Sequence, residues 1–154
     1  MFLYLVQHGD ARREEEDPRR PLSEKGCQDV GRMAAHLRRT KLRVDRIVHS
    51  GKARAEQTAS ILSGRIEVSG EISPIDGLSP LDDPWVWSER LRDMTGDVML
   101  VGHLPHLGRL ASLLLCGDAG RSVISFRMGG VVCLQRDGDG AWTVLWAIVP
   151  EIVA

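Results

Sequence analysis

Phe2-Leu3-Tyr4-Leu5-Val6-Gln7-His8-Gly9-Asp10 is the stretch of sequence that decides the fold. Its first six residues, 2–7, form a short and mostly apolar run rich in strand-forming residues, and a polar turn follows them. A run of this length and composition, closed by a turn, is typical of a strand buried in a sheet. We therefore expect residues 2–7 to form a strand that delivers His8 to the edge of a sheet.

Two later stretches repeat this order and add a helix after the loop. Each has a short apolar run, a polar loop and then apolar positions at helical spacing. In that order the first spans residues 46–49, 50–52 and 53–62, and the second spans residues 97–102, 103–106 and 107–115. Gly64 supplies a stop signal for the first of these helices. The repeated order predicts parallel strands joined by helices.

Between these stretches lie a further helix, a charged loop and a less regular segment. Residues 23–39 place apolar side chains at helical spacing, and Ser23 is a typical helix-capping residue. Residues 12–20 are highly charged and predict a solvated loop. Residues 65–83 predict a short strand and then a loop, and residues 84–94 predict a helix.

The C-terminal part of the chain predicts a β-hairpin. Two apolar runs, residues 130–135 and 142–149, flank Asp137-Gly138-Asp139-Gly140, which is a hairpin signal. Together with the alternating strands and helices before it, this predicts a three-layer α/β/α fold. Its central sheet is expected to be mostly parallel with an antiparallel edge hairpin, in a single domain that spans residues 1–154.

The composition is that of an ordinary globular chain. Hydrophobic residues make up 43%, charged residues 27%, and the formal net charge is -1, which gives no reason to expect nucleic acid or a membrane surface as a partner. No stretch is long enough to span a bilayer, and the N-terminal apolar run is too short for a signal peptide, so we expect a cytoplasmic protein. The cysteines are odd in number and lack CxxC spacing, so we expect small buried hydrophobic side chains at Cys27, Cys116 and Cys133.

Three polar residues follow the ends of predicted parallel strands. His8, Ser50 and His103 each come directly after such a strand. Because sites in open parallel sheets form beyond the carboxyl ends of the strands, we expect these three side chains to converge on one edge. A histidine there can act as a nucleophile, an acid, a base or a metal ligand, and its position alone does not choose between these roles.

The local sequences around these residues resemble the histidine phosphatase superfamily, which has the phosphoglycerate mutase-like fold. His8-Gly9 after a strand, Arg54 after the second strand, and Gly102-His103 after another strand carry the resemblance in this order. Nearly the whole chain is similar to the SixA-type phosphohistidine phosphatases. The matching stretches are Gly9-Asp10-Ala11, Arg20-Pro21-Leu22-Ser23, Arg54-Ala55-Glu56-Gln57-Thr58, Leu78-Ser79-Pro80 and His103-Leu104-Pro105.

The resemblance implies a phosphatase without a cofactor or metal that works through a covalent intermediate. His8 would attack phosphorus, and water would then release phosphate from the phosphohistidine enzyme. Gly9 would let the backbone approach the phosphate, while Arg54 and a protonated His103 would stabilise the charge on its oxygens. Ser50 is a further expected phosphate-binding residue. The implied partner is a phosphorylated protein, such as a phosphotransfer domain, and the short chain would leave the pocket open to it.

Gln7 departs from the family pattern, in which an arginine precedes the nucleophilic histidine. Glutamine can donate hydrogen bonds to phosphate but carries no charge. Loss of one charged donor costs on the order of a hundredfold in rate, unless Arg20 or Arg12 leans in to compensate. Gln7 and Arg20 are therefore included among the expected phosphate-binding residues.

The general acid is a second departure from the pattern of the larger relatives. Gly77 stands where those relatives have a glutamate, and the alternatives are Asp10, Asp76 and Asp82. A histidine leaving group, with an ordinary pKa of about 6.5, needs less acid assistance than an alkoxide. The gap therefore fits a phosphohistidine substrate.

Three other functions use the same residues. The first is a phosphatase for a small phosphorylated metabolite, and the second is a module that binds phosphorylated partners without turnover because of Gln7. The third is a metal site formed by His8, Asp10, His103 and His106. We interpret His106 instead as a helix cap and expect one of Trp85 and Trp87 to be packed in the core.

Overall fold

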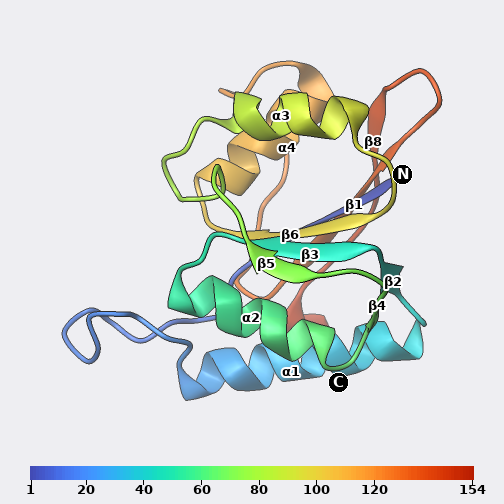
Figure 1. Ribbon diagram of the computed structural model, residues 1–154. Coiled ribbons are helices and arrows are strands. Elements are labelled where there is room, and N and C mark those ends of the chain that lie inside the picture. The colour runs from blue at the N-terminus through green and yellow to red at the C-terminus, as the bar shows by residue number, and fades with distance from the viewer.

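The central feature is a mixed six-stranded sheet with the strand order β5-β3-β6-β1-β7-β8. The computed structural model describes all 154 residues, and Figure 1 shows its layers. The first four strands in this order are parallel, whereas β7 and β8 run antiparallel to their neighbours β1 and β7. The strand bounds are β1 Phe2–Gln7, β3 Arg46–His49, β5 Ile72–Pro74, β6 Val98–Gly102, β7 Val131–Arg136 and β8 Trp142–Ile148.

Helices cover both faces of this sheet, so the predicted three-layer α/β/α fold is confirmed. In Figure 1, α1 (Glu24–Arg39) and α2 (Ala53–Ser63) lie below the sheet, and α3 (Pro84–Asp93) and α4 (His106–Cys116) lie above it. A 3-10 turn, η1 (Pro150–Ile152), follows the last strand. None of the helices combines the length and the apolar character that crossing a bilayer requires.

The ends of the helices follow from local sequence signals. Ser23 caps α1 by accepting a hydrogen bond from the Gly26 N–H at 3.0 Å, and Asp83 caps α3 with Pro84 in the first turn. The buried stripe of α1 has the spacing of one helix face and consists of Val30, Met33, Ala34 and Leu37. These signals are the reason that α1 was predictable almost to the residue.

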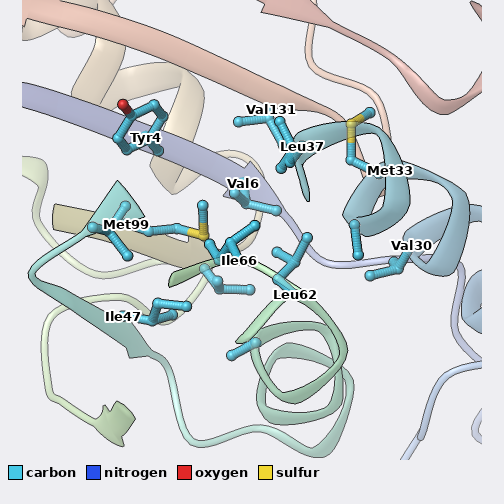
Figure 2. Packing of buried hydrophobic residues seen from close by; sticks show 14 of the residues in the cluster. Tyr4, Val6, Val30, Met33, Leu37, Ile47, Leu62, Ile66, Met99 and Val131 are labelled. Atoms are coloured by element: carbon cyan, nitrogen blue, oxygen red, sulfur yellow. The ribbon is translucent and has the colours of Figure 1, made fainter. Parts of the chain in front are cut away.

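Each face of the sheet has its own hydrophobic core because side chains alternate along β1. Tyr4 and Val6 point toward α1 and α2, where they pack with the residues of Figure 2. Leu3 and Leu5 belong to the second cluster, which includes residues of α3 and α4 such as Leu91 and Leu107. β1 is therefore buried on both faces, as its continuous apolar run predicts.

The segment of residues 65–83 differs from the prediction. It contains two short strands instead of one, β4 (Glu67–Val68) and β5. β4 pairs in parallel with β2 (Arg43–Val44) to form a separate two-stranded sheet, which the sequence did not indicate. Strands of two residues are too short to produce a periodic pattern.

The expected burial of all three cysteines is wrong for two of them. Cys133 is buried on β7, but Cys27 on α1 and Cys116 at the end of α4 are exposed. Cys27 lies three residues before the buried Val30 yet points away from the apolar stripe, and Cys116 occupies the last residue of its helix. Apolar residues at the margin of a helix face or at a helix end are not forced into the core.

Candidate active site

The sheet order brings three strand ends together at one edge. β3, β6 and β1 are adjacent, and Ser50, His103 and His8 follow them. The imidazole centroids of His8 and His103 are 4.9 Å apart, and Ser50 Oγ lies 2.6 Å from His103 Nε2. The three residues that the sequence placed at strand ends are thus close neighbours in space.

The environment of His8 fixes its tautomer. Its Nδ1 lies 2.7 Å from the carbonyl oxygen of Gly9. Because a carbonyl can only accept a hydrogen bond, Nδ1 carries the proton and Nε2 keeps a free lone pair. Burial lowers the pKa of His8, and the charges of Arg54 and Arg20 lower it further. His8 is therefore a neutral imidazole with a nucleophilic Nε2 at neutral pH.

Gly9 is required by packing against α1. A Cβ atom at this position would come within 2.7 Å of Val30 Cγ2 and 3.2 Å of the Gly26 carbonyl oxygen. The Gly9 N–H donates to Thr58 Oγ1 at 3.0 Å, and Thr58 Oγ1 in turn donates to the Arg54 carbonyl at 2.7 Å. The residue was predicted for close approach to phosphate, but its closest neighbours are those of the first helix.

Arg54, Arg20 and Lys52 give the site a positive charge that the protein does not neutralise. None of the three takes part in an ion pair, and Arg54 Nε is buried without a hydrogen-bond partner. Burial lowers the pKa of Arg54, and the charge of Arg20 adds to this effect. Arg20 has a left-handed backbone (φ 47°) and donates from Nε to the Arg12 carbonyl. Such a cluster favours an anion beside the nucleophile.

His103 is neutral in this structure, which differs from the protonated donor that was expected. Burial lowers its pKa to about 3, and the charges of His8, Arg54 and Lys52 add to the effect. Its Nε2 is engaged by Ser50, while Nδ1 is buried without a partner. Protonation of His103 would require a nearby anion to oppose these cations. Ser50 accordingly contacts His103 and positions its ring.

Gln7 lies at the end of β1, in register with Gly102 of β6. Its backbone carbonyl accepts from the Gly129 N–H at 2.9 Å, which ties the loop before β7 to the site. The side-chain Oε1 is buried and has no hydrogen-bond partner. An unpartnered buried amide oxygen is costly, so the position carries an unmet polar requirement.

The candidate general acids all have other partners. Asp10 Oδ2 accepts from Ser23 Oγ, Asp76 pairs with Arg90 at 2.7 Å, and Asp82 accepts from the Ser79 N–H at 2.9 Å. His106 is not the helix cap that was expected. It is the first residue of α4, with 0% of its surface exposed and neither ring nitrogen hydrogen-bonded.

Two residues of the site were missed by sequence reasoning. Lys52 and Thr58 lie on either side of Arg54, in the loop and first helical turns that follow β3. Their proximity to Arg54 was the available signal, since residues at the start of a helix after a parallel strand face the same edge. No group of three or more His, Cys, Asp or Glu side chains is placed to hold a metal ion, and Trp87 is buried whereas Trp85 is exposed.

Comparisons with known proteins agree with this site. Residues 3–79 match the family model described as "Histidine phosphatase superfamily (branch 1)". The phosphohistidine phosphatase SixA of Escherichia coli is 27% identical over 155 residues, which cover 97% of this chain and 94% of that protein. An uncharacterised protein of Picosynechococcus is 32% identical over 142 residues, which cover 88% of this chain and 85% of that protein.

The fold comparison gives the same result at the level of structure. A solved structure of the protein histidine phosphatase SixA complexed with tungstate superposes with a TM-score of 0.87. The two chains are 27% identical, and the match covers 98% of each. The relatives are therefore similar over their whole length and not over an isolated motif.

Proposed function

The chain belongs to the histidine phosphatase superfamily and is a phosphatase, and from that premise we propose that it hydrolyses protein-borne phosphohistidine through a phosphorylated His8. The observation that carries this proposal is the tautomer of His8. The carbonyl of Gly9 holds the proton on Nδ1, which leaves the Nε2 lone pair free beside an unneutralised cationic cluster. A neutral nucleophile beside an anion-binding cluster is the arrangement that phosphoryl transfer requires.

The reaction has two steps. In the first, His8 Nε2 forms a bond to phosphorus as the phosphorus–nitrogen bond of the substrate breaks, and the departing imidazole takes up a proton from solvent or a nearby acid. In the second, water attacks phosphorus, loses a proton and displaces His8, which releases inorganic phosphate. An imidazole leaving group with an ordinary pKa of about 6.5 needs little acid assistance, which fits a site whose nearby carboxylates have other partners.

The remaining site residues stabilise charge on the transferred group. Arg54 offers a planar fork of donors, and Arg20 and Lys52 add positive charge that substitutes for the arginine missing at Gln7. His103 donates from a ring nitrogen, and a bound phosphate raises its pKa from about 3 by supplying the missing negative charge. We assign Gln7 and Gly9 to neutral contacts with phosphate and Ser50 to the orientation of His103.

The substrate class rests on the relatives and on the open site. The similar E. coli protein is a phosphohistidine phosphatase, and the solved SixA holds tungstate, a tetrahedral oxyanion like phosphate. We extend this to a phosphorylated protein as the partner, in a single catalytic domain acting in the cytoplasm on a signalling relay. No cofactor enters either step.

The test incubates the purified protein with a panel of histidine-phosphorylated proteins and small phosphate esters. We expect phosphate release by the wild type and a loss of at least about a thousandfold in His8→Ala. Rapid acid-free quenching and mass spectrometry should find one phosphoryl group on His8. Equal release by the wild type and His8→Ala would remove the nucleophile assignment.

Two other outcomes identify the alternative functions. Turnover of the esters but not of the phosphoproteins would favour a phosphatase for a small metabolite. Activity in Gln7→Arg alone, with tight phosphoprotein binding by the wild type, would favour a binding module.

A further inference from the structure

A basic cavity lies next to the active site on the α4 side. Its volume is about 320 Å³, and it lies between the start of α4 and the loop that leads toward β7. The residues that line it include Leu104 and Pro105, which follow His103 directly, and its charged residues are Arg109 and Arg121. The remaining lining residues are Gly108, Ala119, Gly120, Ser122 and Ile124, so the cavity wall contains no acidic residue.

The two arginines are not used by the protein itself. Both are exposed, and neither guanidinium forms an ion pair or a hydrogen bond within the chain. The nearby Asp118 instead accepts a hydrogen bond from the Gly120 N–H. Free arginine side chains around a cavity, beside a helix start without a side-chain cap, complement an anionic group.

The wall formed by the loop is anchored and does not depend on an exposed turn. The hydroxyl of Ser112, which is fully buried on α4, lies within hydrogen-bond range of the Arg121 carbonyl. Ile124 and Phe126 pack on the hydrophobic core beneath α3 and α4. The Gly129 N–H donates to the carbonyls of Gln7 and His8. The loop therefore joins the cavity to the nucleophile.

An apolar rim accompanies the basic cavity. It consists of Leu104, Val123 and Met128, whose exposed fractions are 39%, 42% and 42%. Leu104 follows His103 in the chain, and Met128 precedes Gly129, so the rim flanks both active-site histidines. Exposed apolar residues next to free arginines suit a protein surface with acidic and apolar side chains better than a small polar metabolite.

We propose that Arg109 and Arg121, with the apolar rim, form the docking surface for an acidic segment of the phosphorylated protein. This proposal rests on the proposed phosphohistidine phosphatase function and names the partner's chemistry. The acidic side chains would enter the cavity while the phosphohistidine reaches His8. The surface would raise the affinity for the protein substrate and leave the chemical step unchanged.

The test compares Arg109→Glu/Arg121→Glu with the wild type on two kinds of substrate, a histidine-phosphorylated phosphotransfer domain and phosphoramidate. We expect KM for the phosphoprotein to rise at least about tenfold, with kcat retained and a weaker dependence on salt. The kinetics with phosphoramidate should not change. Arg38→Glu/Arg65→Glu, which reverses two exposed charges on the opposite helical layer, is the matched control and should behave as the wild type.

Three results would overturn the docking surface. They are an unchanged KM in the cavity variant, an equal rise in the control variant, and an equal loss with phosphoramidate. The affinity of the phosphorylated domain for His8→Ala, with and without the cavity substitutions, separates docking from catalysis. If the wild type releases no phosphate but this affinity still falls at least about tenfold with the substitutions, the proposed function fails and the docking surface stands.

Discussion

The two active-site histidines occupy equivalent places in the topology but have opposite environments. His8 and His103 each follow a central parallel strand, and β1 and β6 are neighbours. His8 uses Nδ1 to contact a backbone carbonyl and keeps Nε2 free, whereas His103 uses Nε2 to contact Ser50 and has its Nδ1 buried. The strand end thus fixes where a histidine lies, and its hydrogen bonds decide which nitrogen can react.

The largest expected effect comes from removing the second histidine. His103→Ala should lower kcat roughly a hundredfold to a thousandfold, because one donor to the transferred phosphoryl group is lost. The phosphorylated enzyme should still form on His8, more slowly, and rapid-quench mass spectrometry would detect it. Complete absence of the phosphorylated form would mean that both histidines are needed for nucleophilic attack, and the comparison would fail.

A second prediction concerns stability in acid. The pKa of folded His103 is about 3 and its ordinary value is 6.5, so the unfolded chain takes up the proton first as the pH falls. The contribution of neutral His103 is complete above pH 6.5 and is lost as the pH falls toward 3. Between pH 6.5 and pH 5 this amounts to about 2 kcal/mol of unfolding free energy.

Urea unfolding at a series of pH values measures this contribution. His103→Gln should show a weaker pH dependence than the wild type, while His36→Gln on α1 should keep the dependence of the wild type. Burial also lowers the pKa of His8, His49 and His106, so part of the acid sensitivity should remain in His103→Gln. Identical pH profiles for the wild type and His103→Gln would contradict the burial of an uncharged His103.

A third change sharpens the comparison on the His8 side. Gln7→Arg should raise kcat about tenfold, because a charge-assisted hydrogen bond to phosphate is about 1.4 kcal/mol stronger than a neutral one. Steady-state kinetics would measure the gain, with Gln7→Lys as a variant that restores charge without the planar fork. A decrease in kcat for both variants would show that Arg20 and Lys52 already supply all the charge that the site accepts.

The smallest expected effect is on the His103 side. Ser50→Ala should lower kcat about fivefold, the equivalent of one hydrogen bond of about 1 kcal/mol, and leave KM nearly unchanged. Ser50→Thr, which keeps the hydroxyl, should restore most of the activity. A rise in KM without a change in kcat would assign Ser50 to phosphate binding instead of the orientation of His103.

The sequence predicted those parts of the molecule that depend on periodic patterns. The buried strand over residues 2–7 and the capped helix after Ser23 have strong local signals, and the structure has both. The proximity of His8, Ser50 and His103 followed from strand order, because parallel strands end at one edge. The family resemblance added the roles, which remain to be tested.

Other features depend on contacts that local sequence does not encode. The neutral state of His103 arises from burial and from three cations on separate segments. The charge of Arg20 near Arg54 depends on a single left-handed residue in an otherwise exposed loop. The burial of His106 depends on how α4 packs, which its position at a helix start does not reveal.

The hydroxyl of Thr58 has a mechanical consequence. Because it bonds to both the Gly9 N–H and the Arg54 carbonyl, it ties the nucleophile's loop to the first turn of α2. A small displacement of α2 would therefore carry Arg54 and the backbone after His8 together, as one rigid body. The spacing between the attacking imidazole and its guanidinium is thus insulated from slow breathing of the sheet edge, and a substrate meets a site that is already assembled.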